Sequence, residues 1–283
     1  MKIGILGVGS MGSRHIKNFM QLGCDVVGYD PVKTPYSNYN EVMDCDAIVI
    51  AAPTRQHFGL IQEACAAKKP LLVEKPLVFT RQELESVSLT QVKMVGYNLR
   101  FHSCVKKVRR WLAEGLIGKP LWAHFTCAQF NDRPDYLRDG VILNWSHEID
   151  LAIHLLGKVD VDYGHCDPKI AEVILRHDNS HCLTTIHLDY VTRPERRGFT
   201  IVGEDGMINA DLIKRTAACR DITDNPIHGF IGDDNWDSNY LDEAAEFISK
   251  ILGEVDPQYF IGCTAQEAYD VMDICLTAKD FNE

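Results

Sequence analysis

The stretch that decides the fold reads Ile3-Gly4-Ile5-Leu6-Gly7-Val8-Gly9-Ser10-Met11-Gly12. An apolar run of strand length leads directly into a Gly-x-Gly-x-x-Gly spacing, and a helical pattern follows it. A strand, a glycine turn and a helix in this order are typical of a dinucleotide-binding domain. Gly7 permits the tight turn, Gly9 lets the backbone approach a pyrophosphate, and Gly12 lets the helix pack closely on the strand.

The helix after the glycines begins with peptide N–H groups that have no partner inside the helix, and its dipole presents a positive end. Both features attract phosphate groups. We therefore expect the cofactor to contact the whole turn, which consists of Gly7, Val8, Gly9, Ser10, Met11 and Gly12.

Asp30 stands at the end of the second expected strand, residues 25–29, and lies 30 − 12 = 18 residues beyond Gly12. A carboxylate at this place accepts hydrogen bonds from the adenosine ribose and repels the additional phosphate of NADP, so the sequence favours NAD. Because the positively charged Lys33 is close to Asp30, NADP stays an alternative cofactor. The alternative interpretation of Asp30 is an ordinary turn aspartate before Pro31.

Apolar strand patterns alternate with helical patterns over the first hundred residues. This alternation predicts an α/β fold with a parallel sheet covered on both faces, the doubly wound Rossmann arrangement. After the first strand and helix, the expected strands are 25–29, 46–52, 71–73 and 92–95, and the expected helices are 56–69 and 81–89.

From about residue 118 the pattern changes to strands with few helices between them, several of which alternate apolar and polar residues. This predicts a C-terminal α+β domain on a large, mostly antiparallel open sheet with one wet face. The expected strands are 121–130, 159–166, 170–177, 181–191, 199–203 and 207–210, and the expected closing helices are 238–252 and 264–278.

We therefore expect a dinucleotide-binding domain at 1–100 and a substrate-binding and oligomerisation domain at 101–283. The last helices are candidates to pack back on the first domain. The cleft between the two domains is the expected active site.

The formal net charge is -11 over 283 residues, which argues against a nucleic acid or an anionic membrane as partner. No apolar run approaches the roughly 20 residues of a membrane helix, and the first apolar run is the first strand itself. We expect a cytoplasmic protein whose substrate is a small polar molecule.

Ten cysteines occur without a Cys-x-x-Cys pair, and most lie inside apolar patterns. We interpret them as small buried hydrophobes in a reducing compartment, and we expect no metal site. Their positions are 24, 45, 65, 104, 127, 166, 182, 219, 263 and 275.

Lys75 follows a short strand of the expected parallel sheet, and Pro76 comes directly after it. Ligands of such sheets bind outside the carboxyl ends of the strands, so the Lys75 ammonium is well placed to hold or polarise a substrate oxygen. The alternative is a solvated loop lysine.

A second set of titratable residues lies in a predicted helix that runs from Asn144 to Gly157. His147, Asp150 and His154 fall at i, i+3 and i+7, so they share one face. A histidine near neutral pH can take a hydroxyl proton while hydride leaves the same carbon, and Asp150 can orient it. The alternative is a structural histidine, which we prefer for His154.

Two polar stretches are weaker candidates. The stretch from Gly96 to His102 follows the last parallel strand, so Asn98 and Arg100 can reach cofactor or substrate. The loop 131–138 precedes the His147 helix and contains Tyr136, which suits a hydroxyl-rich ligand.

Together these residues resemble the Gfo/Idh/MocA family of nicotinamide-dependent oxidoreductases, which includes inositol and glucose–fructose oxidoreductases. The resemblance spans nearly the whole chain and rests on the order and spacing of several motifs. These are Gly7-x-Gly9-x-x-Gly12, Ala52-Pro53-Thr54 with His57, Glu74-Lys75-Pro76, Gly96-Tyr97-Asn98-x-Arg100-Phe101 and Ser146-His147-Glu148-Ile149-Asp150. It implies a Rossmann domain followed by an open-sheet domain, through which members often form dimers or tetramers.

The resemblance also implies roles for single residues. The family commonly carries an aspartate three or four residues before its catalytic histidine or tyrosine, where this chain has Asn144 and Leu143. The implied catalytic residues are Lys75, His147 and Asp150. Cofactor-binding residues beside the glycine turn are Asp30, Ala52, Pro53, Thr54, His57, Glu74, Lys75 and Asn98, and substrate-binding residues are Lys75, Arg100, Tyr136, Asn144 and His147.

The expected function is an NAD(P)-dependent dehydrogenase or reductase that moves a hydride between nicotinamide and a secondary alcohol or ketone of a sugar, cyclitol or sugar derivative. One alternative is an NAD-binding regulator or scaffold of the same fold, which the missing aspartate motivates. Another is a reductase of a non-sugar substrate, such as a linear tetrapyrrole or a dihydrodiol.

Overall fold

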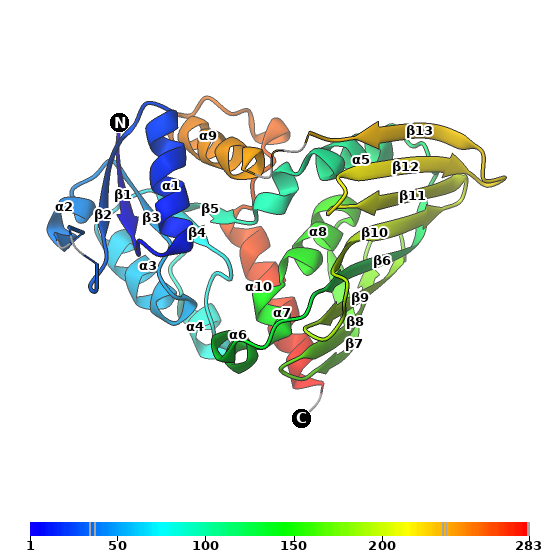
Figure 1. The fold of residues 1–283 in the computed structure, drawn as a ribbon, viewed down its shortest axis with the longest axis horizontal. Coiled ribbons are helices and arrows are strands. Elements are labelled where there is room, and N and C mark those ends of the chain that lie inside the picture. The colour runs from blue at the N-terminus through cyan, green and yellow to red at the C-terminus, as the bar shows by residue number, and fades with distance from the viewer. Residues whose placement is uncertain (34, 37, 234, 236, 282–283) are drawn as a thin grey trace. The chain divides into compact units, whose positions relative to one another are not determined.

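The computed structural model describes residues 1–33, 35–36, 38–233, 235 and 237–281 (Figure 1). The chain divides into two compact units. The first consists of Met1–Phe101 and Trp236–Met272, and the second of His102–Asn235 and Asp273–Glu283.

The first unit contains the predicted parallel sheet, with five strands in the order β2-β1-β3-β4-β5. Its three central strands are fully buried or nearly so, because helices cover both faces of a doubly wound sheet. The strands are β1 (Lys2–Leu6), β2 (Asp25–Tyr29), β3 (Ala47–Ile50), β4 (Leu71–Glu74) and β5 (Val92–Gly96).

Helices α1 and α9 lie side by side in this unit (Figure 1). Phe19 of α1 meets Phe247 of α9 edge to face, and both belong to a core that includes Ile3 and Val49 of the sheet. The helical elements here are α1 (Ser10–Gln21), α2 (Tyr39–Met43), η1 (Thr54–Gln56), α3 (His57–Ala66), α4 (Arg81–Ser86), η2 (Asn98–Phe101), α9 (Ser238–Leu252) and η3 (Pro257–Tyr259). Helix α10 (Ala265–Asp280) passes from the first unit into the second.

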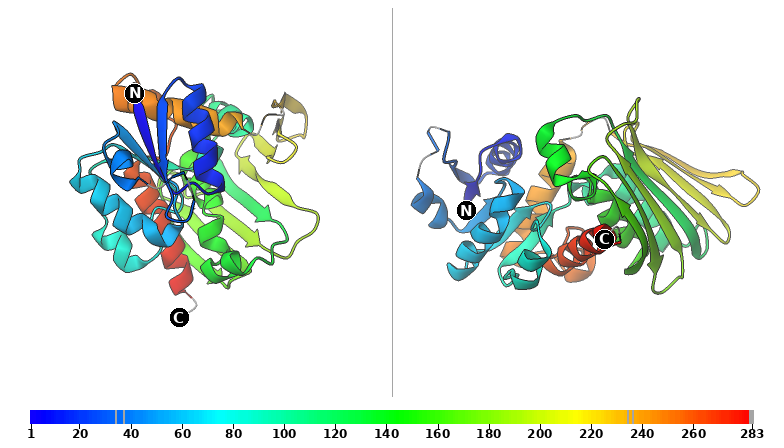
Figure 2. Two further views of the ribbon diagram at one scale, coloured as in Figure 1. Left: turned by 60° about the vertical axis from the view of Figure 1, so that its left-hand side comes forward. Right: turned by 90° about the horizontal axis from the view of Figure 1, so that it is seen from below.

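The second unit contains one eight-stranded sheet in the order β13-β12-β11-β10-β6-β9-β8-β7, and its twist is visible in Figure 2. All neighbouring strands pair antiparallel except β6 and β9, which are parallel, so the predicted fold class is confirmed. The strands are β6 (Pro120–Ala128), β7 (Val159–Cys166), β8 (Ile170–His177), β9 (Leu183–Asp189), β10 (Arg196–Gly203), β11 (Gly206–Asp211), β12 (Thr216–Asp221) and β13 (Pro226–Ile231).

Helices pack on one face of this sheet, with α5 against β11 and β12 and α8 against β6 and β9. Side chains on β9 alternate accordingly, since Ile186 and Leu188 are fully buried and His187 between them is partly exposed. The helices of this unit are α5 (Ser103–Ala113), α6 (Pro134–Asp139), α7 (Val141–Asn144) and α8 (His147–Leu156).

The predicted helix from Asn144 to Gly157 is wrong at its start. Helix α7 ends at Asn144, and α8 begins at His147 and ends before Gly157. Trp145 lies between the helices with φ -114° and ψ 36°, outside the helical region. The break places His147 at the first position of α8, where the positive end of the helix dipole lies.

All ten cysteines are free, and eight are buried, which agrees with their predicted role as small hydrophobes. Among the described residues, no helix combines the length and the apolar composition that a membrane crossing needs.

His102 provides a stability prediction. Its ring is fully buried, its Nδ1 accepts the Cys104 N–H at 3.2 Å, and its Nε2 lies 3.2 Å from the Leu212 carbonyl oxygen. Burial, followed by the charge of Arg215, lowers the pKa of His102 from 6.5 to about 4. Between about pH 4 and pH 6.5, His102 binds a proton in the unfolded chain but not in the folded chain. The free energy of unfolding therefore decreases as the pH falls below 6.5.

From this histidine we expect a loss of about 2 kcal/mol of unfolding free energy between pH 7.5 and pH 5. Urea denaturation at the two pH values measures it. His102→Asn is expected to reduce the difference, whereas His181→Asn, at an exposed histidine, is expected to keep it. An unchanged difference in the His102 variant contradicts the assignment.

Candidate active site

The glycine turn has the geometry that the spacing predicts. Gly7 has a φ of +90°, and a Cβ there would lie 2.6 Å from the Cα of Ala52. A Cβ on Gly12 would lie 1.9 Å from the Gly7 carbonyl oxygen, so only glycine lets helix and strand approach this closely. A Cβ on Gly9 would meet nothing within 4 Å, which leaves room for a ligand at that position.

The first turn of α1 has the features of an anion-binding site. Gly9 caps the helix without a side-chain hydrogen bond, and the first turn contains no acidic residue. Ser10, Met11 and Gly12 are the first three helical residues. Because the N–H groups of a first turn have no partner within the helix, they can hold a pyrophosphate here.

Asp30 lies directly after β2 and is nearly buried. Its Oδ2 accepts the Val8 N–H at 2.9 Å, and its Oδ1 accepts the Val32 N–H at 3.1 Å. The Lys33 ammonium donates to the Val8 carbonyl at 2.5 Å. Asp30 and Lys33 thus bind the N–H and the carbonyl of Val8, and both hold the glycine turn in place.

A pocket of about 460 Å³ opens beside Asp30, a size typical of small-molecule sites. Among the residues that line it are Tyr29, Asp30, Val32, Tyr39, Pro53, Gln56, Leu60 and Glu63. Two carboxylates, those of Asp30 and Glu63, line the pocket, which disfavours the additional phosphate of NADP.

The loops after β3 and β4 meet at His57. Its Nε2 lies 2.9 Å from the Ala52 carbonyl oxygen and its Nδ1 2.9 Å from the Pro76 carbonyl oxygen. The ring is buried, and this burial lowers its pKa although the two carbonyl contacts act in the other direction. His57 thus ties together the Ala52-Pro53-Thr54 loop and the loop that carries Lys75.

Lys75 is the first residue after β4, and Gly7 is the first residue after β1. Since β1 and β4 run parallel in one sheet, both residues lie at its carboxyl edge. The preceding Glu74 is nearly buried, and its carboxylate would contact a Cβ at Gly96, the next residue along the edge.

Glu74 is held by a histidine of the first helix. His15 Nε2 lies 2.7 Å from Glu74 Oε1, and the His15 ring is fully buried. The pair fixes the orientation of the residue that precedes Lys75.

Asn98 and Arg100 lie in η2 and are both buried. The Arg100 Nη1 donates to Glu267 Oε1 at 3.0 Å and to the Gly262 carbonyl at 3.3 Å. The charge of Arg100 contributes to a lowered pKa of Glu267, against the effect of burial. This guanidinium joins η2 to the first turn of α10 and to the segment before it, inside the first unit.

The second unit contains His147 and Asp150, both in the first turn of α8 and both buried. The acidic residue between them, Glu148, is bound by Arg197 of β10 through two hydrogen bonds of 2.7 and 3.1 Å. This nearly buried ion pair fixes the start of α8 to the sheet, and with it the backbone that carries His147. His154 lies in the last turn of the same helix and is partly exposed.

Asn144, the last residue of α7, binds the backbone of Tyr136 in α6. The Asn144 amide nitrogen donates to the carbonyls of Tyr136 and Gly140, both at 3.0 Å. The Tyr136 ring packs edge to face on Tyr190, which Trp145 also contacts. Burial raises the pKa of Tyr190.

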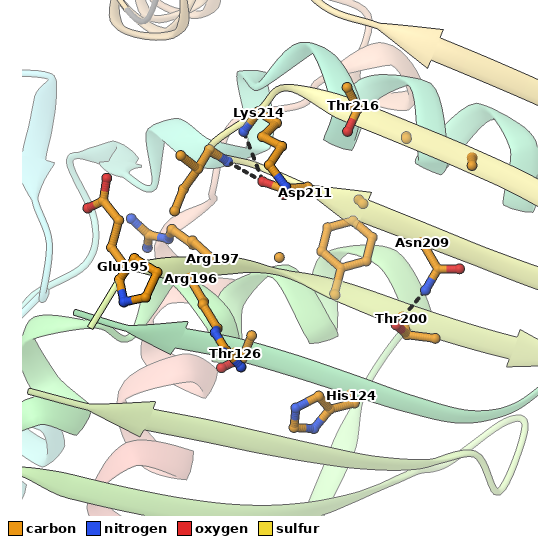
Figure 3. Close-up of a pocket in the computed structure, with 17 residues that line it drawn as sticks. His124, Thr126, Glu195, Arg196, Arg197, Thr200, Asn209, Asp211, Lys214 and Thr216 are labelled. Carbon is orange, nitrogen blue, oxygen red and sulfur yellow. Dashed lines mark hydrogen bonds and ion pairs between the residues drawn. The ribbon is translucent and has the colours of Figure 1, made fainter. Parts of the chain in front are cut away.

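A separate hollow of about 790 Å³ lies on the eight-stranded sheet (Figure 3). Thr126 of β6, Thr200 of β10 and Asn209 of β11 line it, and Asn209 donates to Thr200 at 2.7 Å. Its charged residues include Lys214, which pairs with Asp211 at 3.2 Å.

Two family models match the chain. A model described as "Oxidoreductase family, NAD-binding Rossmann fold" matches residues 24–94, and a model of the GFO/IDH/MocA C-terminal domain matches residues 105–209. The chain belongs to the Gfo/Idh/MocA family. Its first unit therefore contains an NAD-binding Rossmann domain.

Curated members of the Gfo/Idh/MocA family are similar to this chain. The myo-inositol 2-dehydrogenase of Thermotoga maritima is 23% identical over 305 residues, which cover 91% of this chain and 90% of the relative. The scyllo-inositol 2-dehydrogenase (NAD(+)) of Bacillus subtilis is 30% identical over 193 residues. That match spans only about half of the relative's length, 54%, and 56% of this chain.

Solved structures share the fold. Levoglucosan dehydrogenase in complex with NADH and levoglucosan has a TM-score of 0.84 at 15% identity, over 99% of this chain and 98% of that one. UDP-N-acetylglucosamine 3-dehydrogenase from Acidithiobacillus ferrooxidans has a TM-score of 0.82 at 18% identity, over 99% and 97%. At these identities the likeness shows the fold.

The family resemblance implies an aspartate where this chain has Asn144, and the structure shows what the Asn144 amide binds. Its two N–H donors are both used by backbone carbonyls. A carboxylate at this position has no N–H to donate, and its negative charge would lie against the two carbonyl oxygens. We therefore expect Asn144→Asp to destabilise the folded chain by about 2 kcal/mol rather than to raise activity.

Urea unfolding of the Asn144→Asp variant at pH 7.5 measures this loss. Asn144→Ala removes the donors without adding charge and is expected to lose less stability. An Asp variant as stable as the parent, with higher turnover, contradicts the structural role.

Sequence reasoning missed His15, Tyr39, Glu63 and Arg197. His15 stands three residues after Gly12 and therefore shares the helix face that packs on the sheet. Its distance from the glycine motif could have predicted that it faces the sheet. Glu63 and Tyr39 come together only in the folded chain, so no sequence spacing marks them.

Proposed function

We propose that this chain oxidises a secondary alcohol of a cyclitol, sugar or sugar derivative with NAD, through Lys75 and His147. The enzyme class follows from the family and its inositol and sugar dehydrogenase relatives. The observation that carries the proposal is the position of Lys75 at the carboxyl edge of the parallel sheet, the same edge that carries the glycine turn.

The residues present fit the dinucleotide. The space at Gly9, the uncapped first turn of α1 and the pocket beside Asp30 are suited to the pyrophosphate and the adenosine ribose. When bound, the nicotinamide ring accepts the hydride of the alcohol carbon. Ala52, Pro53 and Thr54, with Glu74 and Asn98, complete the proposed cofactor contacts.

In the proposed reaction His147 removes the proton of the substrate hydroxyl, and Lys75 donates a hydrogen bond to the same oxygen as the carbonyl forms. Asp150 orients His147. Tyr136 and Asn144 are proposed to shape the substrate site in the second unit. The buried Arg100 supports the fold through its ion pair with Glu267. The proposed division of labour is cofactor binding by 1–100 and substrate binding and oligomerisation by 101–283.

We further propose that two copies of the chain associate through the eight-stranded sheet. The hollow in Figure 3, with Thr126, Thr200 and Asn209, lies on strands of that sheet. The ten free cysteines support a location in the cytoplasm, because reducing compartments keep thiols unpaired. The substrate is a small polar hydroxylated molecule; neither nucleic acid nor membrane is a proposed partner.

The test is an assay of the purified chain with NAD and a panel of inositols, sugars and nucleotide sugars, followed by the absorbance of the reduced cofactor. Turnover of at least one polyol that disappears in Lys75→Met supports the proposal. NAD binding without reduction by any member of the panel contradicts it and favours an NAD-binding regulator.

A further inference from the structure

The pocket beside Asp30 contains a carboxylate that phosphate and ribose binding do not require. Glu63 of α3 and Tyr39 of α2 line this pocket from two different helices. The Tyr39 hydroxyl donates to Glu63 Oε2 at 2.5 Å. Asp30, which is suited to the ribose, lines the same pocket, so a dinucleotide bound to Asp30 would place its base in the pocket that Glu63 also lines.

The Tyr39–Glu63 pair is fixed in place although Glu63 is exposed. The Tyr39 ring packs edge to face on Tyr29 of β2, with centroids 5.1 Å apart. Burial, together with the hydrogen bond to Glu63, raises the pKa of Tyr39, so the hydroxyl keeps its proton and remains a donor. The carboxylate is therefore presented in one orientation, with its Oε1 still able to accept a hydrogen bond.

The rest of the pocket suits a flat purine. Val32, Pro53 and Leu60 supply apolar surface on which a base can stack. Gln56 has both a donor and an acceptor, so it does not distinguish one purine from another. Glu63 accepts only, because an ionised carboxylate has no proton to donate.

We propose that Glu63, held by Tyr39, accepts a hydrogen bond from the exocyclic amino group of adenine, and that this contact makes the pocket selective for adenine. Hypoxanthine has a carbonyl oxygen in place of the amino group. That oxygen would face the carboxylate as a second acceptor, which is repulsive. The inference deepens the proposed function, since it takes a nicotinamide dinucleotide as the occupant.

The experiment compares NAD with nicotinamide hypoxanthine dinucleotide by titration calorimetry on the purified full chain. We expect the hypoxanthine compound to bind the parent chain about tenfold more weakly, the loss expected for one hydrogen bond to a charged group. Glu63→Gln can donate or accept, so its two dissociation constants are expected to agree within about twofold.

Two further variants sharpen the test. Tyr39→Phe removes the hydroxyl that holds Glu63, and we expect an intermediate preference. Glu85→Gln neutralises an exposed carboxylate on α4 that does not line the pocket, and we expect it to keep the tenfold preference.

Equal binding of the two dinucleotides by the parent overturns the inference, and so does a preference that survives in Glu63→Gln. Failure to bind either dinucleotide overturns it as well. Because these are binding measurements, equal dissociation constants for the two dinucleotides together with normal polyol turnover reject only the role of Glu63. A clear preference without turnover rejects only the proposed catalytic function.

Discussion

Lys75→Met is expected to lower kcat/KM for alcohol oxidation by about a thousandfold, while the dissociation constant for NAD changes by less than about threefold. The methionine keeps the length of the side chain but has no proton to donate to the substrate oxygen. Because that hydrogen bond strengthens as the oxygen loses its proton, its loss falls mainly on kcat. Steady-state kinetics on the best substrate of the panel, with calorimetry for NAD, measure the two quantities.

The matched control is Lys17→Met, which removes an exposed ammonium from α1. We expect this variant to keep both kcat and KM. Retention of parental kcat by Lys75→Met would show that Lys75 is a solvated loop lysine, and the catalytic proposal would then fail.

Gly12→Ala is expected to destabilise the chain by about 3 kcal/mol or more, because its Cβ would lie 1.9 Å from a backbone oxygen of Gly7 that cannot move away cheaply. Gly9→Ala is expected to unfold at the parental urea concentration, since its Cβ meets nothing within 4 Å. Its NAD affinity is nevertheless expected to fall by about a hundredfold, because the added methyl group occupies the space of the pyrophosphate.

Urea unfolding and NAD titration on both variants separate folding from cofactor binding. Gly59→Ala in α3 is the control, as its Cβ also meets nothing within 4 Å, and we expect normal NAD binding. If Gly9→Ala binds NAD as tightly as the parent, the pyrophosphate does not lie on this turn.

Local patterns were sufficient for the strands of the first unit, although helix α2 has no counterpart among the predicted elements. The strands predicted at 25–29, 71–73 and 92–95 match β2, β4 and β5 to within a residue. Residues 71–73 are a short, continuously apolar run, which by itself predicts burial on both faces, whereas the edge strands β2 and β5 include Asp25 and Lys93. The helix predicted at 81–89 ends early, at Ser86, because Val87 adopts an extended backbone.

The second unit was less predictable at one edge of its sheet. Strands β12 and β13 and helices α5 and α6 have no counterpart among the predicted elements, and the prediction of a loop at 131–138 is wrong because Pro134–Asp139 form α6. The β12 residues Thr216–Asp221 are mostly small or polar, and β13 begins with Pro226 and contains Gly229, both poor strand signals. Their pairing with β11 supplies the hydrogen bonds that their own propensity does not favour.

The sequence by itself determined the dinucleotide turn, the parallel and mostly antiparallel sheets, and the candidates Lys75 and His147, because spacing and hydrophobic period are local properties. Only the tertiary structure decided which partners those elements meet. It paired His15 with Glu74, Arg197 with Glu148 and Tyr39 with Glu63, and it used both amide donors of Asn144 on backbone carbonyls. The three side-chain pairs join residues far apart in the chain, which reach hydrogen-bonding distance only in the folded protein.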